Sequence, residues 1–240
     1  MKAKERQHLK QNEFADTALR VVAAATENRQ RVVTLAVVAG LVIALVAGYA
    51  WWRRHTAEQG GSLLGEAMAT VQAPIVPAPT LPGATQTPGT YPTAEARNEA
   101  ALEKFRAVMA QYPFTAAGRS ATYHAAALLL STGKAAEAET LFAQNATEAA
   151  STIYGPMSRM GEAEAQAAQG KYDQAIATFT ALSADRDGPV PVDGVLMQLA
   201  RVQLEAGHAD EAKAAFKRVV DEFPESVYLN EARQELTKLG

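Results

Sequence analysis

The sequence predicts an all-α protein in which one N-terminal transmembrane helix precedes an α-solenoid of helical hairpins. Residues 32–52 are apolar and uncharged, and a helix over them would span roughly 31 Å, close to the ~30 Å hydrocarbon core of a bilayer. A Gly, Ala and Phe pattern recurs every 37 residues in the second half of the chain, which indicates a helical repeat. The predicted parts are a cytoplasmic tail (1–31), a transmembrane helix (32–52), a short helix plus Pro-rich linker (53–92) and a repeat domain (93–240).

The distribution of basic residues predicts the orientation of the membrane segment. Residues 1–31 carry seven Lys or Arg and four acids, whereas residues 53–240 carry 16 and 22. Because Lys and Arg are enriched on the cytoplasmic side, we expect the tail to stay in the cytoplasm and the large domain to be exported. A cleavable signal peptide is the rival interpretation, since Gly48 and Ala50 form a small-x-small site. The apolar run is longer than the ~7–15 residues usual in such peptides, which favours an uncleaved anchor.

Two features of the apolar run bear on its role. Tyr49, Trp51 and Trp52 cluster at one end, as is typical of residues at a membrane–water interface. One helix face carries only small residues at intervals of four, namely Ala36, Gly40, Ala44 and Gly48. Such a stripe lets a second helix approach closely in lipid, so it predicts homo-oligomerisation or docking on a partner's membrane helix. Alternatively, these residues are there only because Gly and Ala suit membrane helices.

A low-complexity bridge follows the apolar run. Residues 56–72 have one apolar side and predict a short helix, weakened by three glycines. Residues 73–92 contain six of the eleven prolines of the chain, and proline at this density excludes helix and disfavours a central strand. We therefore predict an extended linker, which acts as a spacer or as a ligand for a proline-binding partner.

The repeat predicts a helical hairpin as its unit. Three glycines are each followed by Ala after five residues and by Phe after nine: Gly133–Ala138–Phe142, Gly170–Ala175–Phe179 and Gly207–Ala212–Phe216. Ala101 and Phe105 continue the pattern one unit earlier, where residues 56–72 are the available first helix. The glycine suits a tight turn, the small Ala a close helix crossing, and the Phe the space between hairpins. Residues 226–239 predict a terminal capping helix with one apolar stripe.

These residues resemble the tetratricopeptide repeat, which has a small residue in its first helix, Gly at the turn, Ala and an aromatic residue in its second helix, and Pro at the end. The matching residues are Leu199, Ala200, Gly207, Ala212, Phe216 and Pro224 in the last unit, and Gly170, Tyr172, Ala175 and Phe179 in the unit before it. The resemblance covers residues 93–240. The period of 37 residues exceeds the 34 typical of the family, so we expect longer connections at 143–154 and 183–192.

The sequence offers no catalytic, cofactor-binding or metal-binding motif. It has no cysteine, which excludes disulfides, thiolate chemistry and a lipoprotein anchor. Its four histidines have no partner at metal-ligand spacing. The net charge of −3 argues against binding nucleic acid through phosphates. We therefore expect a protein that is not an enzyme and needs no cofactor, although a catalytic site assembled from distant residues would escape this reasoning.

Solenoids bind partners through the concave face that their first helices line. By analogy with the family, the positions facing that groove are Tyr123, Ala127, Leu130, Met157, Met160, Glu164, Met197, Arg201 and Leu204. Three of the six methionines fall there, and flexible thioethers suit a surface that accepts varied apolar segments. Alternatively, these methionines fill gaps in an alanine-rich core.

The order of parts resembles the bacterial YfgM family of ancillary SecYEG translocon subunits, as does the segment 111–142. The segment 223–236 is similar to repeats of CpoB and BamD, which lack this anchor. The resemblance implies a single-pass protein of the cell inner membrane with a periplasmic repeat domain. It also implies SecYEG, periplasmic chaperones or nascent exported chains as partners. The alternative is a cell-envelope scaffold that coordinates division or outer-membrane assembly.

Overall fold

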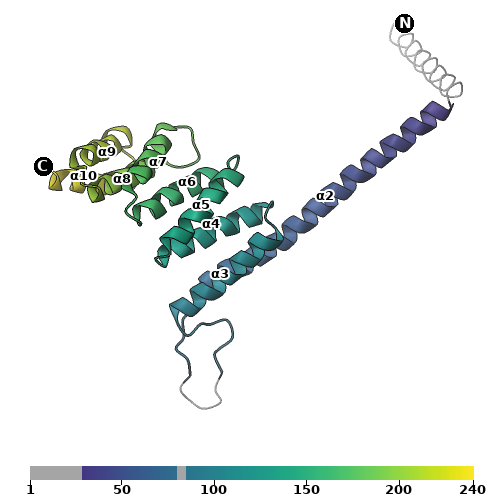
Figure 1. Ribbon diagram of the computed structural model, residues 1–240, viewed down its shortest axis with the longest axis horizontal. Helices are drawn as coiled ribbons and strands as arrows, with labels where there is room; N and C mark the ends of the chain where they lie inside the picture. The colour runs from purple at the N-terminus through teal and green to yellow at the C-terminus, as the bar shows by residue number, and fades with distance from the viewer. Residues whose placement is uncertain (1–28, 80–84) are drawn as a thin grey trace, which may run out of the picture. The chain divides into compact units, whose positions relative to one another are not determined.

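The computed structural model describes residues 29–79 and 85–240, and every regular element in these ranges is a helix (Figure 1). The only extended pairing there is an isolated bridge between Ile75 and Tyr91. The predicted all-α class is thus confirmed. The chain forms two compact units, residues 1–55 and 56–240. The helices are α2 (Arg29–Val71), α3 (Ala94–Gln111), α4 (Ala116–Ser131), α5 (Ala135–Glu148), α6 (Tyr154–Ala167), α7 (Tyr172–Ala184), α8 (Val192–Glu205), α9 (Ala209–Glu222) and α10 (Leu229–Lys238).

Helix α2 contains the apolar run and is long and apolar enough to span a membrane. Its large apolar side chains are exposed between Val33 and Trp52, at 50 to 73% of their surface. The predicted short helix at 56–72 is not a separate element, because α2 continues through its three glycines to Val71. The tail that precedes Arg29 and carries the expected cytoplasmic charge lies outside the described residues.

The last turns of α2 belong to the core of the second unit. Ala67 is fully buried, and Leu63, Leu64 and Met68 pack against the same cluster. Gly60 lies so close to this core that a Cβ there would stand 3.2 Å from Ala117 and from the ring of Tyr112. The end of α2 thus occupies the place of the missing first helix of the first hairpin, and α3 is its second helix.

The Pro-rich segment leaves α2 and returns to α3 with its two ends tied together. The N–H of Val76 donates to the carbonyl of Tyr91 (2.9 Å), and the N–H of Tyr91 donates to the carbonyl of Pro74 (3.0 Å). The side-chain amide of Gln86 donates to the carbonyl of Val76 (2.9 Å). Residues 80–84 lie outside the described part of the segment.

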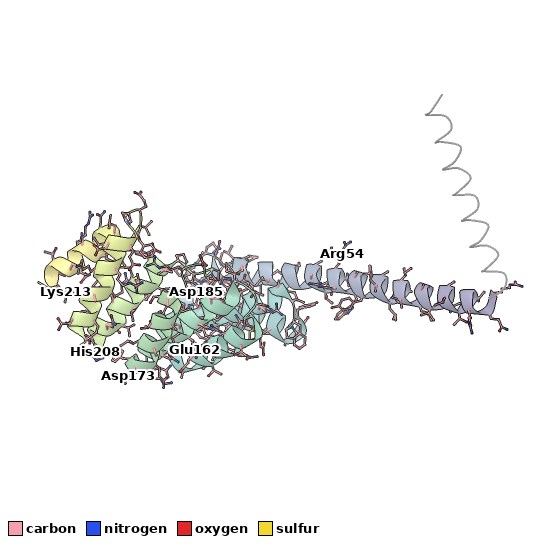
Figure 2. The ribbon with its side chains drawn as sticks, turned by 90° about the horizontal axis from the view of Figure 1, so that it is seen from above. Arg54, Glu162, Asp173, Asp185, His208 and Lys213 are labelled. Atoms are coloured by element: carbon pink, nitrogen blue, oxygen red, sulfur yellow. The ribbon has the colours of Figure 1, made fainter. Side chains whose placement is uncertain are left out.

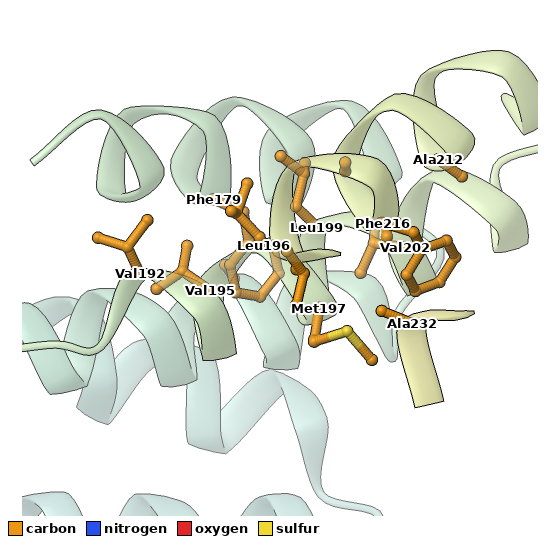
Figure 3. Close-up of a cluster of buried hydrophobic side chains, with 14 of the residues drawn as sticks. Phe179, Val192, Val195, Leu196, Met197, Leu199, Val202, Ala212, Phe216 and Ala232 are labelled. Carbon is orange, nitrogen blue, oxygen red and sulfur yellow. The ribbon is translucent and has the colours of Figure 1, made fainter. Parts of the chain in front are cut away.

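The four phenylalanines of the repeat are all buried, with at most 2% of their surface exposed: Phe105, Phe142, Phe179 and Phe216. Each lies in the second helix of a hairpin, on α3, α5, α7 or α9. The predicted turn glycines Gly133, Gly170 and Gly207 have φ of 79°, 75° and 82°, a conformation that glycine adopts without strain. Figure 3 shows Phe179 and Phe216 within the buried cluster that α8 shares with its neighbours.

The same hydrogen bonds close the first helix of each hairpin at these glycines. At the second turn, the N–H of Lys171 donates to the carbonyl of Gln166 and the N–H of Gly170 donates to that of Ala167, both at 2.9 Å. The turns at Gly133 and Gly207 repeat this pair of bonds. The arrangement satisfies carbonyl groups that the helix end leaves unpaired and requires a left-handed residue after the last turn.

The two connections expected to be long differ in the structure. The connection between α7 and α8 runs from Asp185 to Pro191, as predicted. The expectation for 143–154 is half wrong, because α5 continues to Glu148 and leaves only five residues before Tyr154. Asn145 accounts for the longer helix. Its buried side chain donates hydrogen bonds to α4 and α6, and these bonds stabilise the additional turn of α5.

Replacing the turn glycine with alanine tests the hairpin geometry. We expect Gly170→Ala to lower the free energy of unfolding by about 1 kcal/mol, because a Cβ disfavours the left-handed conformation. The measurement is the midpoint of urea unfolding of the full chain in detergent, with the helix content monitored by circular dichroism. Gly65→Ala is the matched control, because Gly65 lies inside α2 with no heavy atom within 4 Å of an added Cβ. That variant should be unchanged or slightly more stable, and an equal loss in both variants would contradict the prediction.

Candidate functional site

An open groove of about 680 Å³ lies along the first helices of the second and third hairpins. Helix α4 supplies one wall, α6 supplies another, and the segment 189–191 before α8 closes one side. Apart from Ser131 and Glu164, its lining is apolar or aromatic: Tyr123, Ala127, Leu130, Phe142, Ile153, Met157, Met160, Gly161, Pro189, Val190 and Pro191. A second hollow, at α5, α6 and α7, is more polar and carries Arg159, Glu162 and Asp185.

The groove depends on a close approach between α6 and the repeat phenylalanine of α5. A Cβ added to Gly161 would stand 2.5 Å from the ring of Phe142, so a larger residue there would displace this buried ring. The absent side chain leaves both the ring and the Gly161 backbone in the lining of the groove. The Phe that fills the core of the second hairpin therefore also contributes to the candidate site.

A buried polar cluster fixes α4, α5 and α6 relative to one another. The Asn145 side-chain amide, 1% exposed, donates to Ser158 Oγ (2.9 Å) and to the carbonyl of Arg119 (3.2 Å). The Tyr154 hydroxyl donates to Ser120 Oγ (3.0 Å). Because a buried polar group is costly without its partner, these bonds favour one arrangement of the three helices.

Tyr123 lies at the centre of an aromatic group beside the groove. Its ring centroid is 5.7 Å from that of Phe142, at an interplanar angle of 63°, and 5.9 Å from that of Tyr154. The edge-to-face contact holds the Tyr123 ring in place. Burial, followed by the negative charge of Glu164, raises the pKa of the Tyr123 phenol. The negative charge of Glu164 thus disfavours the ionised form of the Tyr123 phenol.

Among the described residues, Glu164 is the one formally charged residue in the lining of this groove. Burial raises the pKa of its carboxyl, and the Gln198 hydrogen bond and the charge of Arg201 partly oppose that rise. The Gln198 amide donates to Glu164 Oε1 at 3.1 Å. Arg201 itself pairs with Glu231 at 2.5 Å and donates to Gln198. The carboxylate is thus held by a neutral donor in largely apolar surroundings.

The structure brings together most of the predicted groove residues. Tyr123, Leu130, Met157, Met160 and Glu164 line the groove, together with Ala127. The expectation for Met197 is wrong, because only 1% of its surface is exposed and its side chain belongs to the core (Figure 3). Arg201 and Leu204 do not line the groove either. Arg201 is held by Glu231, and Leu204 packs against the core cluster.

Sequence reasoning missed the lining residues that lie outside the first helices. Ile153, 54% exposed, precedes α6, and Pro189, Val190 and Pro191 precede α8. The sequence signals for them were the connections expected to be long, at 143–154 and 183–192, and these did not reveal the side toward which each connection folds. In α2, the predicted stripe residues are exposed, and among the described residues a Cβ added to Gly40 or Gly48 would meet nothing within 4 Å beyond the neighbouring backbone of its own helix.

Comparison with known proteins agrees with this architecture. Residues 166–236 match the tetratricopeptide repeat family. No curated protein matches the chain. Two crystal structures of a kinesin light chain-like protein from Podosopora anserina with nearly identical TPR-like repeats, one of them a point variant, are 16% identical to it. The alignment with the variant covers 77% of this chain and 86% of the variant's chain, with a TM-score of 0.58. The other structure has a TM-score of 0.57. A tetratricopeptide repeat protein from Parabacteroides merdae ATCC 43184 is 13% identical and has a TM-score of 0.54, covering 76% of this chain and 60% of its own.

Residues 166–236 are therefore similar to tetratricopeptide repeats, and the fold is a tetratricopeptide-like solenoid. Repeats of this type form protein–protein interaction modules and are typically non-enzymatic scaffolds. The groove along α4 and α6 is accordingly a candidate site for a partner protein.

The raised pKa of Glu164 predicts how its substitution changes stability with pH. The folded protein holds this proton more tightly than the unfolded chain, so raising the pH ionises the unfolded state first and lowers the free energy of unfolding. Glu164→Gln removes that loss and keeps an acceptor for Gln198. We expect urea midpoints to show the variant gaining stability over the wild type between about pH 4 and about pH 7.

Glu139 provides a control of opposite sign. The hydrogen bond from Lys171 lowers the pKa of its carboxyl, so its ionised form stabilises the folded state above the unfolded pKa. Glu139→Gln should lose stability relative to the wild type over the same rise in pH. A Glu164→Gln variant that also loses stability as the pH rises would contradict the assignment.

Proposed function

We propose that this protein is a membrane-anchored adaptor whose groove holds an apolar segment of a partner protein. The observation that carries the proposal is the apolar groove along α4 and α6 in a fold that serves protein binding. Met157 and Met160 are half-buried there, so their flexible side chains can adjust to different ligands. A groove of about 680 Å³ accommodates a few side chains, which suits a short segment of polypeptide.

Three features of the N-terminal part support the membrane anchor. The run 32–52 has no charge and lies within a continuous helix. Tyr49, Trp51 and Trp52 are 56 to 68% exposed at one end of the run, as residues of an aromatic belt would be. The basic excess of residues 1–31 supports a cytoplasmic N-terminus. We therefore place the chain in the cell inner membrane as a single-pass protein with its repeat domain in the periplasm.

For the partner, we propose the Sec translocon together with periplasmic chaperones or nascent exported chains. The order of tail, anchor and small repeat domain, with its similarity to the YfgM family, supports this assignment. The small-residue face of α2 would then contact a translocon helix, since Ala36, Gly40, Ala44 and Gly48 allow close approach in lipid. The same face would also support homo-oligomerisation. A cell-envelope scaffold, in which α2 is only a tether, is the alternative that the experiments below separate.

Protease accessibility tests the orientation. In spheroplasts with an intact inner membrane, added protease should digest residues 93–240 and spare an epitope tag placed on the N-terminus. The cleaved product should remain in the membrane fraction after a carbonate wash, because α2 stays in the bilayer. A repeat domain that survives protease until detergent is added would overturn the orientation, and a carbonate-soluble product would overturn the anchor.

Site-specific photo-crosslinking tests the partner. A crosslinker in place of Gly40 should capture a subunit of SecYEG, whereas one at Val42, about 200° around the helix, should capture it several-fold less. A crosslinker at Met160 should capture a chaperone or an exported chain, and one at the exposed Asp173 on α7 should not (Figure 2).

The outcomes separate the two candidate roles. Capture of SecYEG from Gly40 but not from Val42 supports the translocon adaptor. Capture of division or outer-membrane assembly proteins at Met160, with no translocon product at Gly40, supports the envelope scaffold. Equal crosslinking from Met160 and Asp173 would contradict the groove as the binding face.

A further inference from the structure

The lining of the groove contains an isolated negative charge. Every other lining residue is apolar, aromatic or an uncharged hydroxyl group, so Glu164 is the only side chain there with a formal charge. Among the described residues, the neutral amide of Gln198 donates a hydrogen bond to its Oε1 at 3.1 Å. An ionised carboxylate in apolar surroundings gains more from a cation than an exposed one does, because water screens it less.

The aromatic wall beside Glu164 favours the same sign of ligand charge. The face of an aromatic ring attracts a cation that sits within ~6 Å of its centre. Tyr123 lines the groove and interacts electrostatically with Glu164. Its position is fixed by the contact with Phe142 at 5.7 Å. The carboxylate on α6 and the aromatic ring on α4 would both stabilise a cation and repel an anion.

The neighbouring basic residue does not already fill this role. Arg201 lies close enough to favour the ionised form of Glu164, but its guanidinium pairs with Glu231 at 2.5 Å and donates to Gln198 Oε1 at 3.1 Å. Arg201 does not line the groove. The Glu164 carboxylate therefore faces the groove with a neutral hydrogen-bond donor at its back.

We propose that the groove selects apolar polypeptide segments that carry one Lys or Arg, and that this cation binds between the Glu164 carboxylate and the Tyr123 ring. The proposal rests on the function proposed above, that the groove binds protein segments, and adds the chemistry of the preferred segment. The apolar side chains of the ligand would contact Met157, Met160 and Leu130, while the charge fixes its position along the groove.

A pair of peptides that differ only in charge tests the preference. One is a short dye-labelled Leu- and Ala-rich peptide with a central Arg, and its twin has citrulline, an uncharged side chain of nearly the same shape, at that position. The full chain is placed in nanodiscs of zwitterionic lipid, so that an anionic surface does not concentrate the Arg peptide. Fluorescence anisotropy should show about tenfold tighter binding of the Arg peptide, as expected for one charge-assisted contact.

Two matched variants assign the preference to Glu164. Glu164→Gln should bring the ratio of the two affinities close to one without weakening the citrulline peptide. Glu162 lies two residues away on α6 (Figure 2) and lines the second hollow instead. The control variant Glu162→Gln should therefore keep the wild-type ratio of affinities. Circular dichroism of both variants checks that the helices are intact.

The other outcomes each overturn a defined part of the argument. Equal binding of the two peptides to the wild type overturns the charge preference and leaves the groove as a protein-binding site. A ratio that survives in Glu164→Gln overturns the assignment to this residue. If neither peptide binds, both the preference and the proposed function of the groove fail.

Discussion

The burial of one phenylalanine per hairpin is the contact on which the rest of this structure depends. Phe105, Phe142, Phe179 and Phe216 are 37 residues apart and at most 2% exposed, and each fills the space where its hairpin meets its neighbours. At Phe142 this contact also shapes the candidate site, because α6 must offer Gly161 to the ring. Stability and the shape of the candidate groove are therefore coupled at one side chain, since a change that loosens the core there alters the groove as well.

The repeating part of the fold was predictable because its residues obey local rules that are written in the sequence. A glycine that must adopt positive φ, an alanine at a helix crossing and a buried aromatic residue recur at one spacing, and the structure has them at all three turns. Counting back from Gly133 and Gly170 also placed Tyr123, Met157, Met160 and Glu164 in the lining of one groove. Features outside the repeat followed no such rule. Ile153 and Pro189 lie in connections, where no periodicity indicates the direction of a side chain.

Met197 shows why the counting failed in the last hairpin. A groove position is open only where no other part of the chain covers it. In the last hairpin, the segment at 226–231 turns back over α8. Ser226 bonds to Asp193 at 2.6 Å, the Tyr228 ring lies 3.6 Å from a Cβ placed on Gly194, and Glu231 pairs with Arg201. These contacts cover the face of α8 that bears Met197, as a terminal cap should. The groove thus ends where the cap begins, which leaves Glu164 near the limit of the open surface.

The isolated β-bridge between Ile75 and Tyr91 ties together the two ends of the Pro-rich segment. The geometry of the first hairpin therefore need not depend on the length of this segment. The two backbone hydrogen bonds of the bridge join the stretch that follows α2 to the stretch that precedes α3. The entropy of closing such a loop changes slowly with its length. Sequence insertions in this segment should consequently cost the fold little, which makes it a suitable place to introduce an epitope or a purification tag.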